Sequence, residues 1–195
     1  MPPKLKPKIL LPRKINNCRY VWDELEVRKS LEKGAGYGVF STKNLPVGTM
    51  IPIIGTHARK KETGTHLYAR RDGVKINGDP NIKPYKKVGT FGLSISMMLN
   101  ESVKKKFNCK FRFDYIVVVA PIKKGAELLL YYGDTYSRVG YDISQNKYIH
   151  AEYPFYNNIP AHKYPKNRKA ILEMYDEVIY KCETTRGNQD NPIEI

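Results

Sequence analysis

Cysteine is scarce in this chain of 195 residues, and the three cysteines are odd in number and far apart. That pattern argues against a disulfide framework and fits a reducing compartment. No CxxC or Cys-His cluster occurs, so we expect no zinc site and no other bound metal. No apolar run approaches the roughly 20 residues that a membrane helix needs, and no apolar leader with a small-residue cleavage site begins the chain. The sequence therefore predicts an intracellular protein that does not span a membrane.

Acidic side chains are also few: 19 Asp and Glu stand against 34 Lys and Arg, for a formal net charge of +15. Such a field attracts polyanions, so nucleic acid, or a complex that contains it, is the expected partner. A free basic peptide would be repelled at long range. A basic protein substrate would therefore be presented on DNA or another acidic assembly, or would meet local acids in the cleft.

The 41% of hydrophobic residues, with scattered Gly and Pro, is typical of a folded globular chain. Residues 1–20 combine basic residues with prolines, which predicts an extended arm that is either solvated or in contact with phosphates. Residues 21–136 form the predicted domain, with a polar, basic insert at about 56–92. Residues 137–195 are a flank rich in aromatics that includes a helical pattern around 170–181.

Apolar patterns predict several elements within the domain. We expect one or two strands between Tyr20 and Ser30 and another from Thr49 to Ile54. Leu93 to Leu99 is apolar enough for a short buried helix, which would deliver Asn100. Phe107 to Val119 alternates and then becomes fully apolar, as a strand that enters the core does.

Residues 120–134 combine a polar turn, an apolar run and a tyrosine pair followed by glycine. Leu128 to Tyr132 has strand length and is too short for a helix, and Gly133 lets the backbone turn after it. A phenol at the end of a buried strand is held rigidly and points into whatever cleft lies there, so Tyr132 is a candidate catalytic hydroxyl. The alternative is that both tyrosines are ordinary sheet aromatics.

A second stretch, Gly34-Ala35-Gly36-Tyr37-Gly38, predicts a loop in which a ligand can approach the backbone closely. Tyr37 adds a flat apolar face. The loop is not a P-loop, because no Gly-Lys-Ser/Thr follows it. It is not a dinucleotide fingerprint either, because Val39-Phe40-Ser41 continues as a strand instead of opening a helix. The alternative is a plain glycine-rich hairpin turn.

Three stretches over residues 26–136, in the same order, resemble the SET domain, the lysine methyltransferase fold. The first is the glycine loop followed by Leu45-Pro46-Val47-Gly48. The second is Asn100-Glu101-Ser102 with Asn108, which resembles the family's asparagine-histidine-serine motif with its later asparagine. The third is Gly125-Ala126-Glu127-Leu128 with Tyr132-Gly133, which resembles the family's closing motif.

The resemblance implies a mainly β fold: several short sheets with a threaded, knot-like C-terminal segment, to which this chain adds a C-terminal helical annex. It implies a protein-lysine N-methyltransferase that uses S-adenosylmethionine, with Tyr132 as the catalytic phenol. A phenol with a pKa of about 10 is a poor base at neutral pH, so Tyr132 would orient the amine. The cofactor contacts carried over from the family are Ala35, Gly36, Tyr37, Gly38, Tyr68, Asn100 and Glu101. The lysine channel would include Ile53, Tyr115 and Leu130.

The chain departs from the family pattern in several places. Ile53 stands where a tyrosine is usual, which removes one aromatic wall of the channel. Glu101 stands where histidine is usual. Its carboxylate would favour a nearby sulfonium and ammonium, unless the histidine side chain is needed to order the pocket. Leu130 has no hydroxyl to hold a water, which favours di- or trimethylation. Residues 137–195 would pack on the domain in place of the zinc segment that many relatives carry.

The family and the basic charge together point to histone, presented in a nucleosome, or to another chromatin-associated protein as substrate, and to a nuclear location. The compact architecture leaves a viral or parasite origin open, with action in an infected host cell. Two other functions stay open. One is a SET fold without activity that serves as a binding module, which would not bind S-adenosylmethionine. The other is an unrelated basic nucleic-acid-binding protein with steeply salt-dependent binding.

Overall fold

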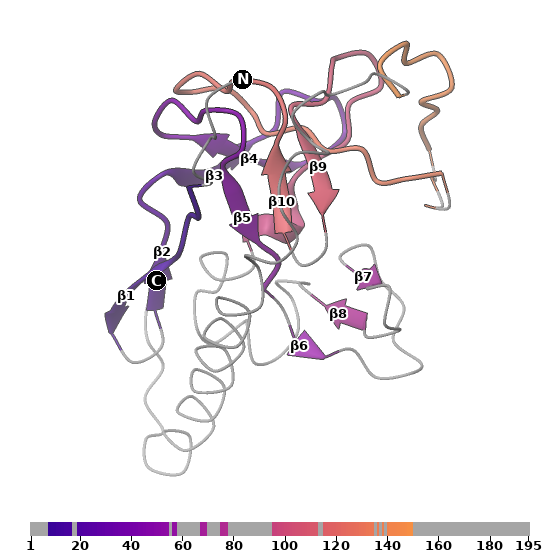
Figure 1. Cartoon of the computed structure of the whole chain (residues 1–195). Coiled ribbons are helices and arrows are strands. Elements are labelled where there is room, and N and C mark those ends of the chain that lie inside the picture. Colours follow the sequence, from indigo (N-terminus) through magenta and orange to yellow (C-terminus); the bar gives the residue numbers. More distant parts are fainter. Residues whose placement is uncertain are drawn as a thin grey trace, which may run out of the picture.

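The computed structural model describes residues 8–16, 19–54, 56–57, 67–69, 75–77, 95–112, 115–134, 136, 138 and 140–149. Within these residues, ten short strands form four small antiparallel sheets, and the one helix is a single 3-10 turn (Figure 1). The prediction of a mainly β fold built from several short sheets is therefore confirmed. No helix in these ranges is long and apolar enough to cross a membrane. The helical annex lies outside the described residues and stays a prediction.

Two sheets are simple hairpins. Strands β1 (Arg13–Asn16) and β2 (Arg19–Val21) form the first, and β3 (Leu25–Lys29) and β4 (Tyr37–Ser41) form the second. One or two strands were expected between Tyr20 and Ser30, and β2 and β3 confirm this prediction. The glycine loop connects β3 to β4, so it joins the two strands of an antiparallel pair.

The other two sheets have three strands each. One has the order β5-β10-β9, from β5 (Met50–Pro52), β10 (Tyr115–Val118) and β9 (Cys109–Arg112). The other has the order β6-β8-β7, from β6 (Thr56–His57), β8 (Lys75–Asn77) and β7 (Leu67–Ala69). This second sheet comes from the predicted insert. The rest of residues 56–92 lies outside the described part.

The prediction of one strand from Phe107 to Val119 is wrong, because the chain reverses there. Strands β9 and β10 pair antiparallel, with Tyr115 opposite Arg112 and Val118 opposite Cys109. The two halves of the sequence pattern belong to different positions in the sheet. The half-exposed residues of β9 occupy an edge, and the fully buried residues of β10 lie between β9 and β5.

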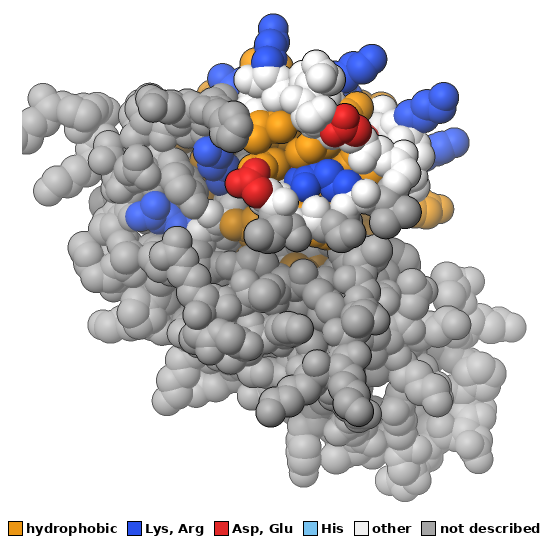
Figure 2. Space-filling model, turned by 90° about the vertical axis from the view of Figure 1, so that its right-hand side faces the viewer, with side chains coloured by type: hydrophobic (Ala, Val, Ile, Leu, Met, Phe, Trp, Pro, Cys, Tyr) orange, Lys and Arg blue, Asp and Glu red, His pale blue; other side chains and the backbone are white. Residues whose placement is uncertain are grey.

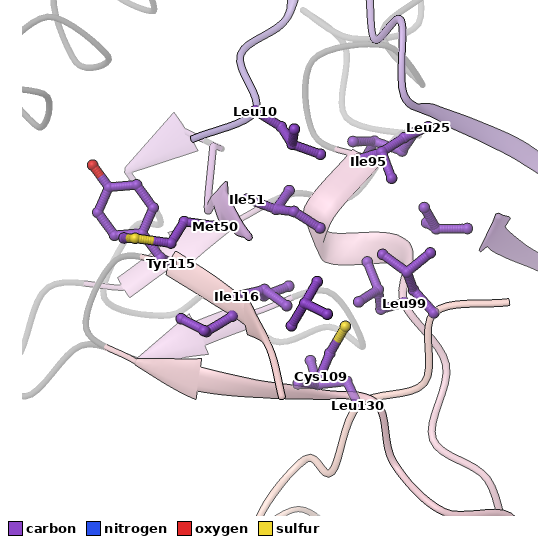
Figure 3. Packing of buried hydrophobic residues seen from close by; sticks show 14 of the residues in the cluster. Leu10, Leu25, Met50, Ile51, Ile95, Leu99, Cys109, Tyr115, Ile116 and Leu130 are labelled. Carbon is purple, nitrogen blue, oxygen red and sulfur yellow. The ribbon is translucent and has the colours of Figure 1, made fainter. Parts of the chain in front are cut away.

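The core is one cluster of apolar side chains around β10, in which Ile116, Val117 and Val118 are completely buried. Figure 3 shows Leu130 and Cys109 close to Ile116, while Tyr115 lies beside Met50 at a separate end of the cluster. The short helix η1 (Ile95–Met98) contributes Ile95 and Met98, and Leu99 follows it into the same cluster.

Residues 127–130 do not form the regular strand that the sequence predicts. They make single bridges to three separate segments, at Phe40, Asn100 and Cys109. The Leu130 N–H donates to the Asn100 carbonyl at 2.9 Å, and the Leu129 carbonyl accepts from the Cys109 N–H at 3.0 Å. The N–H and C=O of one trans peptide point in opposite directions. The segment therefore passes between the two ends of the loop 101–108, which agrees with the predicted threading.

Candidate functional site

The glycine loop contains two glycines that need their conformation and one that needs its small size. Gly34 and Gly36 have positive φ angles of 84° and 69°, as expected of a loop that exposes its backbone. Tyr37 follows with 62% of its surface exposed. Gly38 has no positive φ, but a Cβ built there would lie 2.1 Å from Glu127 Oε1 and 2.8 Å from Asn100 Nδ2. The backbone at Gly38 thus lies directly against two polar side chains.

Glu127 is the acid that joins this loop to the rest of the site. Only 5% exposed, it accepts hydrogen bonds from Ser30 Oγ at 2.7 Å, from the Leu31 N–H at 2.9 Å and from Asn100 Nδ2 at 3.1 Å. A buried carboxylate is tolerated when such donors satisfy it. In the sequence, Glu127 is marked only as part of the closing motif, and that motif is the available signal for its role.

Asn100 connects the glycine loop to the closing segment. It follows helix η1, which confirms the predicted short helix before it. Its Nδ2 donates to the Tyr37 carbonyl at 2.9 Å, and its own carbonyl accepts from Leu130. The side chain and the backbone of one residue therefore hold both segments.

Tyr132 is fixed at its backbone and at its phenol. The N–H donates to Glu101 Oε1 at 2.8 Å, and the phenol Oη donates to the Leu99 carbonyl at 2.7 Å. Its ring packs on Tyr136, with centroids 4.7 Å apart. Burial raises the pKa of Tyr132 above its usual range, and the neighbouring Tyr141, Tyr136 and Glu101 reinforce the shift. The phenol is therefore protonated at neutral pH, and its lone pairs can accept a hydrogen bond.

Glu101 is paired with an arginine that the sequence analysis did not select. Arg138 Nε lies 2.7 Å from Glu101 Oε2, and Arg138 Nη2 lies 2.8 Å from Oε1. The Tyr141 hydroxyl donates to Oε2 at 3.1 Å. The sequence analysis treated Glu101 as an added negative charge near the cofactor, whereas the structure neutralises it locally. No sequence signal marked Arg138, which lies in an irregular aromatic stretch.

A further set of contacts ties the loop after Asn100 to its surroundings. Glu32, in the connection from β3 to the glycine loop, accepts from Ser102 Oγ at 2.9 Å and from Lys105 Nζ at 2.6 Å. From the other side, Asn146 Nδ2 donates to the carbonyls of Ser102 and Lys105 at 2.8 and 3.1 Å. Residues 102–105 are thus held between Glu32 and Asn146, which belongs to the flank of residues 137–195.

The structure brings together the glycine loop, Asn100, Glu101 and Tyr132. It places the predicted channel residues in the apolar core, where Ile53, Tyr115 and Leu130 are all buried. Figure 3 shows Tyr115 and Leu130 in this core. Tyr132 packs against the edge of the same cluster. Tyr68 belongs to β7, and its side chain lies outside the described part. Among the described residues, no group of three or more His, Cys, Asp or Glu could hold a metal ion.

No family model matches the sequence, and no curated protein is similar to it. Several solved structures are similar. The methyltransferase domain of human PR domain-containing protein 2 is 18% identical with a TM-score of 0.42, over 60% of this chain and 82% of that one. KRYPTONITE, solved with mCHH DNA, H3(1-15) peptide and SAH, is 18% identical with a TM-score of 0.41, over 61% and 25%.

Polycomb repressive complex 2 of Chaetomium thermophilum is 16% identical with a TM-score of 0.44, over 60% of this chain and 16% of that one. This chain therefore spans at most a quarter of the length of the last two chains. It is similar in structure to SET-domain methyltransferases, the family that its motifs resemble.

Proposed function

We propose that this protein is a protein-lysine N-methyltransferase that uses S-adenosylmethionine. The observation that carries the proposal is the path of contacts between the glycine loop and the phenol. Asn100 holds the Tyr37 carbonyl, and its neighbour Leu99 accepts the hydrogen bond of the Tyr132 phenol. A loop suited to a cofactor and a rigidly held hydroxyl are thus attached to two consecutive residues of one segment.

The residues of the glycine loop fit S-adenosylmethionine. Gly34 and Gly36 expose backbone at positive φ, and the exposed ring of Tyr37 can cover a flat group. Within the described residues, both side-chain hydrogen bonds of Asn100 are donated by Nδ2. Its Oδ1 is therefore the acceptor for the cofactor's ammonium. When bound, the cofactor would supply an electrophilic methyl group on a sulfonium sulfur, which passes to a neutral amine while the sulfur leaves as a thioether.

The protein's part in this reaction is to orient and to desolvate. A free lysine has a pKa of about 10.4, and a channel poor in water favours its neutral form. Tyr132 does not act as the base, since its pKa is raised and its proton is donated to the Leu99 carbonyl. Its lone pairs orient the amine, and the amine's proton leaves to water. Alignment of the reacting groups is worth on the order of 7 kcal/mol or more.

We propose a histone in a nucleosome as the substrate, and hence a nuclear, chromatin-associated location. The net charge of +15 repels a free basic tail but attracts nucleosomal DNA. Lys104, Lys105 and Lys106 are exposed on the loop that Glu32 and Asn146 hold beside the site. Figure 2 shows Lys and Arg side chains standing out on one face of the described part, around a centre that contains apolar and also some acidic side chains. We assign DNA contact to Lys104, Lys105 and Lys106.

In this proposal the flank of residues 137–195 takes the place of a zinc segment, and the support comes from those of its residues that the structure describes. Arg138, Tyr141 and Asn146 each attach this stretch to residues 101–105 through hydrogen bonds. Such contacts can close one side of a cleft without a metal.

The test compares wild-type protein with Tyr132→Phe and with Tyr131→Phe as a matched control. Tyr131 precedes the catalytic candidate and packs on Phe107 at 5.5 Å, a contact that phenylalanine preserves. Each protein is titrated with S-adenosylmethionine by calorimetry and then given radiolabelled cofactor with histones and with nucleosomes. We expect all three to bind the cofactor, while wild type and Tyr131→Phe transfer label, with nucleosomes preferred, and Tyr132→Phe does not.

Absence of cofactor binding by the wild-type protein would overturn the proposal. A SET-fold binding module or a nucleic-acid-binding protein would then remain. Tight DNA binding that weakens steeply with added salt would identify the second of these.

A further inference from the structure

Arg138 makes several hydrogen bonds close together, and none of them takes part directly in methyl transfer. Its guanidinium grips both oxygens of Glu101, at 2.7 and 2.8 Å. It also donates to the Gly133 carbonyl at 2.9 Å and to the Tyr136 carbonyl at 3.0 Å. Arginine suits such a site because its planar fork can serve a carboxylate and backbone carbonyls together.

The acid in this pair is in direct contact with the backbone of the candidate catalytic residue. Glu101 Oε1 receives the Tyr132 N–H at 2.8 Å, and Arg138 holds the same oxygen. The carbonyl of the next residue, Gly133, is held by Arg138, and Gly133 has a φ of 95°. The peptide before Tyr132 and the turn after it are therefore fixed by one ion pair.

The burial of the pair makes its two partners dependent on each other. The Glu101 side chain is 0% exposed, and that of Arg138 is 13% exposed. Without Arg138, Glu101 would be a buried carboxylate whose remaining donors, among the residues that the structure describes, are the Tyr132 N–H and the Tyr141 hydroxyl. A buried charge without its partner is strongly unfavourable, so the side chain moves or draws in water, and its other hydrogen bonds loosen.

We propose that Arg138 is a positioning residue, which acts through Glu101 to hold the backbone of Tyr132 so that its phenol meets the substrate amine. The inference rests on the proposed function, because the amine is the substrate assigned there. Arg138 itself touches no reacting atom. The pair fixes the backbone end of Tyr132, while Leu99 fixes the phenol end.

The variants are Arg138→Ala, which removes all the contacts, and Arg138→Lys, which keeps the charge but not the fork. The matched control is Arg28→Ala. Arg28 also pairs with an acid, Glu26, donates to a carbonyl, that of Gly125, and lies 4.0 Å from the ring centroid of Phe40. It makes the same kinds of contact as Arg138 without touching Tyr132.

Steady-state kinetics separates positioning from binding. Because a displacement of about 1 Å can lower a rate on the order of 100-fold, we expect Arg138→Ala to lower kcat by roughly 10- to 100-fold. We expect KM for cofactor and nucleosome to change by no more than about twofold. Arg138→Lys should restore part of kcat, and Arg28→Ala should leave it unchanged. Adding Glu101→Gln to Arg138→Ala should cause little further loss, because the pair acts as a unit.

Amide hydrogen exchange provides a readout that needs no activity. In Arg138→Ala, the Tyr132 amide should exchange about tenfold faster or more, since a hydrogen bond to a charged group is weakened. The Leu130 amide, which donates to the Asn100 carbonyl, should keep its protection. Arg28→Ala should leave the Tyr132 amide protected.

If the wild-type protein transfers no methyl group, the proposed function is overturned. If the Tyr132 amide then still exchanges faster in Arg138→Ala, the contact by which Arg138 holds the Tyr132 backbone is supported. An unchanged kcat and an unchanged Tyr132 amide in Arg138→Ala, with only a lower Tm, would overturn the inference. Where Arg138→Ala does not fold, the same two measurements on Arg138→Lys decide between these outcomes.

Discussion

Replacing Gly38 by alanine tests whether the glycine loop and Glu127 are in close contact. Gly38 lies in strand β4 without a positive φ, so alanine fits its backbone conformation. On that ground alone the substitution would stabilise the protein by about 0.4–1 kcal/mol, because it restricts the unfolded chain. The structure predicts the opposite sign. The new Cβ would lie 2.1 Å from Glu127 Oε1, whereas real Cβ atoms come no closer than 3.0 Å to another heavy atom. One of the two atoms must therefore move by at least 0.9 Å, the difference between 3.0 and 2.1 Å.

The size of the expected destabilisation depends on the hydrogen bonds that Glu127 loses when it moves. Its carboxylate accepts three hydrogen bonds of 2.7–3.1 Å, and a shift of that size breaks at least one of them. A hydrogen bond to a charged group contributes about 1.5–3 kcal/mol, and the crowding itself costs about 1–3 kcal/mol. After the unfolded-state gain is subtracted, we expect Gly38→Ala to lower the free energy of unfolding by about 2 kcal/mol or more.

Urea unfolding of Gly38→Ala and of Gly36→Ala, each with and without Glu127→Ala, measures this effect. Gly36 is the matched control, because its φ of 69° strains alanine while a Cβ there meets nothing within 4 Å. Gly36→Ala should cost about 1–2 kcal/mol in both backgrounds. In the Glu127→Ala background, Gly38→Ala should lose most of its cost, and only the 2.8 Å approach to Asn100 Nδ2 remains to offset the gain of about 0.4–1 kcal/mol from the restricted unfolded chain. Equal destabilisation by Gly38→Ala in both backgrounds would refute the contact.

Two further predictions concern ionisable groups. Burial raises the pKa of the Cys109 thiol and so keeps the thiol protonated and unreactive. In a variant with Cys18→Ser and Cys182→Ser, we therefore expect iodoacetamide to alkylate Cys109 only as fast as the protein unfolds. Burial and the nearby Asp134 raise the pKa of Tyr131 from 10.0 to about 12. Folding then favours the neutral phenol. The contribution of this phenol to the free energy of unfolding is intact below pH 10 and is lost as pH rises from 10 through about 12. Urea midpoints measured on both sides of pH 10 would detect the loss.

Each of these predictions has a clear contrary result. Rapid alkylation of Cys109 under native conditions, at a rate that urea does not increase, would contradict its burial. A urea midpoint for wild type that does not fall above pH 10, or a Tyr131→Phe variant that falls as steeply as wild type, would contradict the assignment to that phenol.

Features that depend on neighbours in sequence could be predicted. The glycines at positive φ, the short helix before Asn100 and the strands before Ser30 all follow from local preferences. The hairpin at Arg112 to Tyr115 was missed because an edge strand and a central strand run together into one apolar pattern. A pattern alone does not reveal which residues face a second strand.

Partners far apart in sequence could not be predicted. Glu101 meets Arg138 across 37 residues, and Glu127 meets Ser30 across 97. An isolated acid or base in a sequence could pair with many others, and only the tertiary fold selects one. The motif resemblance named Asn100 and Tyr132, but it gave no information on the groups that hold them.

The passage of residues 127–130 between the two ends of the loop 101–108 also has a consequence for how the protein folds. Because Glu127 must find Ser30 across 97 residues, closing that interval costs roughly 4 kcal/mol of chain entropy, by the logarithmic dependence on loop length. Contacts of such long range are typical of slow folding. During synthesis, the glycine loop emerges long before its anchor, so the candidate site is completed late, after the closing segment has left the ribosome.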